Sequence, residues 1–332
     1  MLYILILLSI VSGISNGWAE NSNLGANSQS GVCHRSLEVV RALEAQTGKN
    51  CQQITSWDCE RLQTLSINSQ NYFVIQERDF KGLKSLTKLD LAGNGLVEIP
   101  DFAFRDLVKL QFLDLSNNSL NRVGPNVFRN LTQLKVLNFS QNELRFLDAS
   151  LFRGLNEVEE LDMSHNAFGE VPSAIWDLKG LRSLNISSNR HIVKLKNFGS
   201  LRHLQTLLIS SCSISSLESG IFNRLGMLQE LSFDRNSIKV LDSEAFVGLK
   251  SLVKLDLTEH ALPEIKSGVF EPLTTLQELY LTRNLIGVID AKAFAANKSL
   301  QVVHLNENRL RSVPSTTFKY QGQLQQLYLQ YN

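Results

Sequence analysis

The chain has 332 residues, of which 43% are hydrophobic and 20% are charged. Its 33 basic and 32 acidic residues leave a formal net charge of only +1. This balance provides no basic footprint for nucleic acid or for an anionic membrane, so we expect neither as a partner.

The first 19 residues are interpreted as a signal peptide. An apolar run from Leu2 to Val11 is followed by small and polar residues that end at Ala19, as is typical of a signal-peptidase site. The run is too short for a good membrane span, and no later segment approaches one. We therefore expect an exported protein, either secreted or held in the cell envelope or periplasm. Residues 20–32 are rich in Asn, Ser and Gly and are expected to be a flexible lead-in.

Residues 33–61 predict a small helical cap. Ser36 is a candidate N-cap, and Gly48 stands near the expected C-terminal end. Between them, apolar residues recur at helical spacing: Leu37, Val40 and Leu43. Such a helix would cover the apolar end of the first coil in a stacked fold.

The four cysteines suggest one disulfide. Cys33 and Cys51 bracket the expected helix, and in an exported protein they should pair. Cys59 either competes with Cys51 or stays buried as a thiol. Because Cys212 lies far along the chain, we expect one disulfide and two free thiols.

One pattern repeats through residues 62–332. In LTKLDLAGNGL, at 86–96, leucines occupy the first, fourth, sixth and eleventh places and Asn the ninth. Ten further copies follow at steps of 24 residues, except for two steps of 23 on either side of position 189. The Leu-x-Leu alternation gives each copy one short strand, and stacked copies would bury the leucines beneath a parallel sheet.

The pattern LxxLxLxxNxL resembles the leucine-rich repeat, in its typical 24-residue extracellular class. This resemblance implies an α/β solenoid, a leucine-rich repeat horseshoe with a parallel concave sheet, about 11 repeats and a small helical N-terminal cap. The cap itself is similar to that of exported bacterial leucine-rich repeat proteins, in which C-x-R-S/T-x-x-V-x-x-A precedes a second Cys. The matching residues here are Cys33, Arg35, Ser36, Val39, Ala42 and Cys51. This second resemblance favours a bacterial envelope or the medium.

The ninth place forms a column that we interpret as structural, because an amide can satisfy backbone groups buried between coils. This ladder consists of Asn94, Asn118, Asn142, Asn166, Asn189, Cys212, Asn236, His260, Asn284 and Asn308. We interpret Cys212 and His260 as substituted ladder positions, the alternatives being a reactive thiol or a metal ligand. A second column, of aromatics about ten residues further on, predicts an apolar spine: Phe80, Phe104, Phe128, Phe152, Trp176, Phe198, Phe222, Phe246, Phe270, Phe294 and Phe318.

The last copy, 324–332, is followed by no capping helix or cysteine cluster. Leu327 and Leu329 would therefore expose core and a strand edge. Two explanations are open: the sequence is a fragment of a longer repeat protein, or another chain covers the edge, for example by end-to-end self-association.

The candidate ligand-binding surface is the concave face, whose outward strand positions are not needed for the core. Strands about 4.8 Å apart would make this face about 50 Å long. Its central column is acidic and polar in the first half and aromatic toward the end. The candidate residues are Tyr280, His304, Tyr328, Arg283 and Glu278 at the aromatic end, and Asp114, Asp162 and Phe112 in the acidic half. Exposed aromatics with an Arg are typical of interface hot spots. The competing interpretation is that the Asp residues merely solubilise the sheet.

Asn-x-Ser/Thr sequons occur at Asn117, Asn130, Asn138, Asn185 and Asn297. Asn138 and Asn185 lie in the central concave column, where a glycan would obstruct a ligand. If the source glycosylates them, that half is not the binding face.

The sequence has no Gly-rich phosphate loop, H-E-x-x-H, C-x-x-C or G-x-S-x-G motif. The repeats use nearly the whole mature chain, so we expect no enzyme, cofactor or metal. The leading hypothesis is an exported, non-catalytic recognition module that binds a protein on its concave face. One alternative is a protein that binds carbohydrate or an envelope polymer, since Tyr rings also stack on sugars. Another is the N-terminal fragment of a larger surface receptor or adhesin.

Overall fold

The computed structural model describes residues 31–67 and 73–332. The expected signal peptide and nearly all of the expected lead-in lie outside the described residues. None of the described helices is long and apolar enough to cross a membrane.

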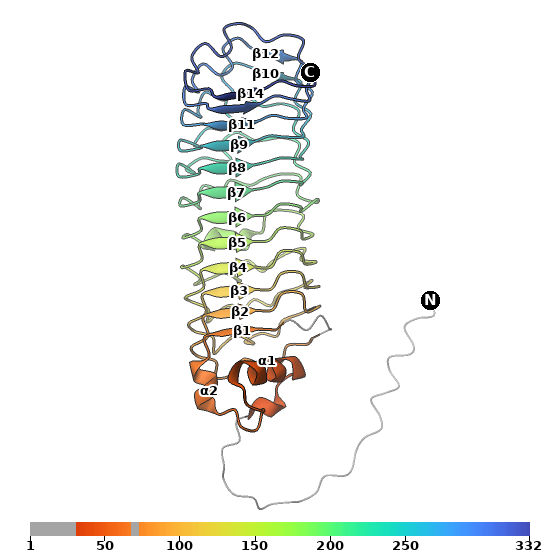
Figure 1. The fold of residues 1–332 in the computed structure, drawn as a ribbon, viewed down its shortest axis with the longest axis vertical. Coiled ribbons are helices and arrows are strands. Elements are labelled where there is room, and N and C mark those ends of the chain that lie inside the picture. The colour runs from red at the N-terminus through yellow and green to blue at the C-terminus, as the bar shows by residue number, and fades with distance from the viewer. Residues whose placement is uncertain (1–30, 68–72) are drawn as a thin grey trace, which may run out of the picture.

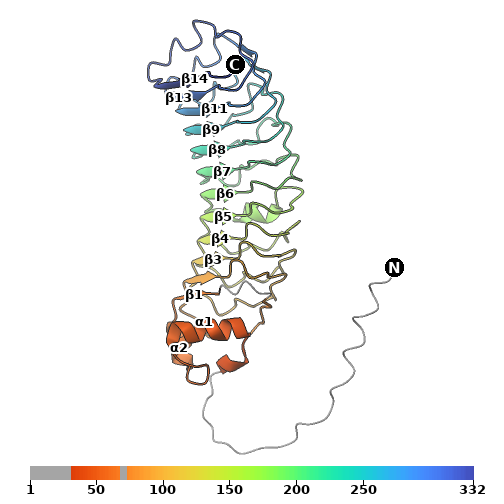
Figure 2. The same ribbon diagram turned by 45° about the vertical axis from the view of Figure 1, so that its right-hand side comes forward.

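The described residues form a stack of coils with one parallel sheet along its length (Figures 1 and 2). The sheet has 12 strands in the order β1-β2-β3-β4-β5-β6-β7-β8-β9-β11-β13-β14. They are β1 (Thr64–Ser66), β2 (Lys88–Asp90), β3 (Phe112–Asp114), β4 (Val136–Asn138), β5 (Glu160–Asp162), β6 (Ser183–Asn185), β7 (Thr206–Leu208), β8 (Glu230–Ser232), β9 (Lys254–Asp256), β11 (Glu278–Tyr280), β13 (Val302–His304) and β14 (Gln326–Tyr328). The predicted solenoid is thereby confirmed.

Register follows the sequence period. Leu89 pairs with Leu113, for example, whereas Leu161 pairs with Leu184, one residue earlier than the common step would give. In every strand of this 12-stranded sheet except β14, the middle residue is buried and the residues on either side of it face outward. Because side chains alternate along a strand, those outward residues form the concave face.

A small second sheet was not predicted. It consists of β10 (Glu264–Ile265) and β12 (Val288–Ile289), paired in parallel. Two-residue strands carry too little alternation to be recognised from sequence.

The aromatic column forms much of the core of the return segments. The Phe104 and Phe128 ring centroids are 6.5 Å apart and nearly parallel, and those of Phe294 and Phe318 are 5.2 Å apart. Phe80 and the phenylalanines from Phe104 to Phe294 are fully buried. Most of these rings pack on the ring of an adjacent coil, which couples those neighbouring repeats.

Two helices, α1 (Leu37–Thr47) and α2 (Ser56–Arg61), cover the first coil (Figure 1). Gly48 ends α1 in the left-handed region at φ 67°, which favours glycine. Sequence analysis did not predict α2, which begins at a capping box of Thr55 and Asp58. Lys49 also donates to the Asp58 carboxylate, and these bonds lower the pKa of Asp58 to about 2.

The predicted disulfide between Cys33 and Cys51 is present. The other two thiols, Cys59 and Cys212, are free and buried. Polar contacts also attach the cap to the first coils: the fully buried Asp79 carboxylate accepts from the Ser36 amide and hydroxyl, both at 2.8 Å. Arg35 donates to the backbone carbonyls of Asp79 and Lys81, and burial lowers its pKa.

Ladder amides satisfy the turns between coils. The Nδ2 of Asn142 donates to the carbonyls of Leu115, Phe139 and Ser140, and its Oδ1 accepts from the Leu120 amide at 2.9 Å. Most ladder asparagines repeat this arrangement. Cys212 has only long sulfur contacts, at 3.7 Å, to the carbonyls of Ile186 and Ser210, and burial raises the pKa of its thiol to about 11.

His260 replaces the ladder amide differently. Its Nδ1 accepts from the Ile238 amide at 3.2 Å, which places the neutral ring's proton on Nε2. Nε2 is buried and has no hydrogen-bond partner among the described residues. Burial lowers the pKa of His260 to about 4.

The return segments also carry two buried amides whose structural role sequence analysis did not predict. Asn297 Nδ2 donates to the carbonyls of Phe270 and Leu273, both at 2.8 Å. One coil later, Gln321 Nε2 donates to Phe294 at 2.7 Å. Both residues are buried, so their amides pair carbonyl groups of the preceding coil that water cannot reach.

We predict that Asn297 remains unmodified when the chain is secreted from a glycosylating host, although Asn297 begins a sequon. Its side chain is inaccessible and its amide is already committed to two carbonyls. Site-resolved mass spectrometry tests this, with the exposed sequon Asn130 as the accessible control. An occupied Asn297 in folded protein would contradict the packing of this coil.

Candidate functional site

Three aromatic side chains lie in a row on the concave face. Tyr280, His304 and Tyr328 are the last residues of β11, β13 and β14, and strand pairing places them opposite one another. Ring centroids are 4.7 Å apart for Tyr280 and His304 and 4.3 Å apart for His304 and Tyr328, with the planes within 18° of parallel. We call these three residues the ring row. All three are half-buried.

Hydrogen bonds within each strand fix the outer rings. The Tyr280 hydroxyl donates to Glu278 Oε2 at 2.9 Å, and the Tyr328 hydroxyl donates to Gln326 Oε1 at 3.0 Å. Lys254 lies 5.9 Å from the Tyr280 ring centroid. Burial, followed by the bond to Glu278, raises the pKa of Tyr280, so this phenol remains neutral at physiological pH. The ring row is therefore a pre-ordered aromatic surface beside charged groups.

Arg283, which the sequence grouped with these aromatics, lies beyond the end of β11. Its guanidinium is paired with Glu259 at 3.1 Å and Glu307 at 2.7 Å, residues of the two adjacent coils. These exposed pairs raise the pKa of Arg283. Arg283 thus belongs to a charged rim, and no hydrogen bond joins it to the ring row among the described residues.

The acidic half of the face is engaged in local turns. Asp114 Oδ1 accepts from the Ser116 amide, and Asp162 Oδ1 accepts from the Ser164 amide, both at 2.8 Å. Their second oxygens accept from the asparagine side chains of the following strands. These contacts give the Asp residues a structural role at the strand ends. Phe112 lies 4.8 Å from the Lys88 amine, measured to the ring centroid.

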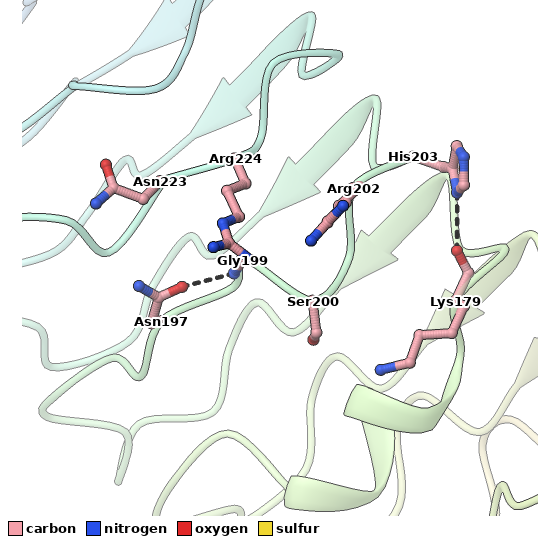
Figure 3. Close-up of a pocket in the computed structure, with 8 residues that line it drawn as sticks. All are labelled: Lys179, Asn197, Gly199, Ser200, Arg202, His203, Asn223 and Arg224. Atoms are coloured by element: carbon pink, nitrogen blue, oxygen red, sulfur yellow. Dashed lines mark hydrogen bonds between the residues drawn. The ribbon is translucent and has the colours of Figure 1, made fainter.

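A feature that sequence analysis did not identify lies away from the concave face. A surface hollow of about 670 Å³ is bordered by residues that lead into β6, β7 and β8, among them Lys179, Arg202, His203 and Arg224 (Figure 3). The sequence signal was the pair of 23-residue steps, which marks the same coils. Among the described residues, no group of His, Cys, Asp and Glu side chains could hold a metal ion.

Comparison with protein families explains the repeat. The leucine rich repeat family matches residues 60–120, 113–168, 142–191, 202–262 and 274–332. The chain belongs to the leucine-rich repeat family. A comparison with curated protein sequences gives no match.

Solved structures share the fold. A leucine-rich repeat protein of Leptospira interrogans is 28% identical with a TM-score of 0.74, covering 83% of this chain and 68% of its own. An internalin of Listeria monocytogenes is 19% identical with a TM-score of 0.61, covering 89% of each chain. Toll of Drosophila, solved with Spätzle, is 21% identical with a TM-score of 0.67 and covers 85% of this chain, which spans only 43% of Toll.

Proposed function

We propose that this leucine-rich repeat protein is an exported recognition module that binds a protein ligand at the ring row. The observation that carries the proposal is the row itself, three stacked, half-buried rings on adjacent strands. Ordered aromatic side chains lose little conformational entropy on binding, which is why they recur in binding surfaces. The neighbouring charges of Lys254 and Glu278 supply a polar surround.

The ring geometry favours a protein over a carbohydrate. A sugar stacks on a free aromatic face, whereas His304 has one tyrosine against each of its faces. The row therefore presents mainly ring edges and hydroxyls outward. Edges and hydroxyls suit apolar and hydrogen-bonding side chains of a protein surface.

Export is supported by the disulfide, because such bonds persist in oxidising compartments. A protein ligand is further supported by the structure of Toll, which was solved with Spätzle. Carbohydrate binding is the second candidate, on the outer faces of the two tyrosines.

We predict that Tyr280→Ala/Tyr328→Ala weakens binding of the protein ligand by about 100-fold or more, since hot-spot aromatics contribute about 2 kcal/mol each. The ligand would first be isolated by pull-down from the medium and envelope fraction of the source cells, and then measured in purified form. Tyr280→Phe/Tyr328→Phe, which keeps the rings, should retain most of the affinity.

Tyr320→Ala is the matched control, because it removes a 54%-exposed ring that is not part of the row. Equal affinity of the double-alanine variant and the parent would reject the ring row as the binding site. If the parent binds particular sugars on a glycan array and the double-alanine variant does not, the ligand of the ring row is a carbohydrate rather than a protein.

A further inference from the structure

The hollow bordered by Arg202 and Arg224 lies at the coils where the two short repeats occur. Three consecutive return segments border it: Lys179 precedes β6, residues 197–203 precede β7, and Asn223 and Arg224 precede β8. Where most coils place an aromatic ten residues after the ladder position, Phe198 follows Asn189 by only nine. The volume of the hollow, about 670 Å³, is within the usual range for small-molecule sites.

The side chains around the hollow are strongly cationic in an almost neutral protein. Lys179, Arg202 and Arg224 border it together with His203, and no carboxylate does so among the described residues. Figure 3 shows these basic side chains gathered around one open space. These side chains are exposed, so water screens their mutual repulsion, while an anion placed among them would be attracted by several positive charges at once.

The two arginines have no competing protein partner. Within the described ranges, no hydrogen bond or ion pair occupies the guanidinium of Arg202 or Arg224, in contrast to Arg283, which has two carboxylates. Lys179 donates one hydrogen bond to the Trp176 carbonyl, which leaves two of its ammonium hydrogens free for a ligand. Two free guanidinium groups provide the planar donor pairs that bind phosphate and sulfate in a bidentate manner.

Arg224 stands where three other repeats have a glycine. Two residues after the spine aromatic, Gly82, Gly154 and Gly248 have φ of 80°, 88° and 107°, and Arg224 has φ of 73°. This left-handed region is less favourable for a residue with a Cβ than for glycine. Arg224 is one of twelve described non-glycine residues with positive φ, and glycine can replace it without disturbing this backbone conformation.

Hydrogen bonds and one close backbone approach order the wall of the hollow. Asn197 accepts from the Gly199 amide at 2.6 Å (Figure 3). Asn197 also donates to the Gly220 carbonyl at 2.8 Å. A Cβ on Gly199 would lie 2.8 Å from the Asn223 carbonyl oxygen, so only glycine permits this close approach. His203 Nδ1 bonds the Lys179 carbonyl at 2.9 Å, which joins two of the three coils.

We propose that this hollow is a binding site for a tetrahedral oxyanion, phosphate or sulfate, carried either by a free ion or by an ester on a larger ligand. Arg202 and Arg224 bind the oxyanion, and Lys179 adds a third positive charge. The site is independent of the ring row, since it lies on the segments that precede the strands.

The test is calorimetric titration of the full chain with inorganic phosphate, sulfate and glucose 6-phosphate, with glucose as the uncharged control. Arg224→Gly is the decisive variant, because glycine suits the backbone found there. We expect Arg224→Gly to weaken oxyanion binding about tenfold or more, without lowering the melting temperature. Arg202→Gln/Arg224→Gly should abolish saturable binding.

Arg122→Gln/Arg311→Gln is the matched control, because it removes the same charge from two exposed arginines outside the hollow. We expect this control to bind as the parent does. If glucose 6-phosphate binds more tightly than phosphate, the ligand is an ester. If the two bind equally, the ligand is a free ion. The proposal is overturned if the parent binds none of the three anions, if Arg224→Gly binds as well as the parent, or if the control loses as much.

Discussion

Asn142→Ala is expected to lower the free energy of unfolding by about 3 to 5 kcal/mol, since each buried group left unpaired costs about 1 to 3 kcal/mol. The Asn142 side chain accepts from the Leu120 amide and donates to the Leu115 carbonyl, both one coil earlier. Alanine would remove both contacts and admit no water, because the site is buried. Urea denaturation followed by circular dichroism measures the difference.

Asn130→Ala provides the control for this effect. Asn130 also donates to a carbonyl of the preceding coil, that of Arg105 at 3.0 Å, but it is exposed. Water can replace this bond, so the loss should stay below about 1 kcal/mol. Similar small losses in both variants would show that the ladder contributes little to stability.

The second large effect concerns pH. His260 titrates near 6.5 when unfolded and at about 4 in the fold, because burial disfavours its charged form. As the pH falls below 6.5, the unfolded chain takes up the proton first, so stability is lost between about pH 6.5 and pH 4. Below pH 4 both states are protonated and the loss is complete, at about 3 kcal/mol.

His260→Asn isolates this contribution. Asparagine restores the side chain found at most ladder positions and cannot titrate, so the variant should gain stability relative to the parent as the pH falls through this range. Denaturation at pH 7, 5.5 and 4 measures the difference in free energy of unfolding between parent and variant. The titration of carboxylates cancels in this difference, because both proteins contain the same carboxylates. A parent and variant whose stabilities fall in parallel would contradict a buried neutral His260.

Much of the fold was predictable because the same spacing of leucine and asparagine recurs in nearly every repeat. Leucine spacing fixed the strands, and the paired cysteines of the cap were recognisable from their position around one helix. The helix α2 was missed because six residues show almost no periodicity, although Thr55 and Asp58 form a capping-box signal. Asn297 was missed as a structural amide because it resembles an ordinary sequon.

The candidate sites were less predictable, since they depend on side-chain direction. The period alone aligned Tyr280, His304 and Tyr328, but it could not show that their rings stack face to face. Nor could it separate Arg283 from them, because its partners Glu259 and Glu307 lie a full coil away on either side. The hollow was not predictable, because the two 23-residue repeats mark where the coils are irregular but not which side chains lie together there.

The aromatic spine also divides the molecule along its length. Among the described residues, ring contacts join consecutive spine aromatics from Phe80 to Phe152, from Trp176 to Phe222 and from Phe246 to Phe318, but none joins Phe152 to Trp176 or Phe222 to Phe246. Weaker coupling at these two junctions would let the solenoid open in three blocks rather than all at once. Under tension or heat, we expect the coils to part first at these two junctions, where the continuous hydrophobic core lacks the contacts between consecutive spine rings found elsewhere in the described chain.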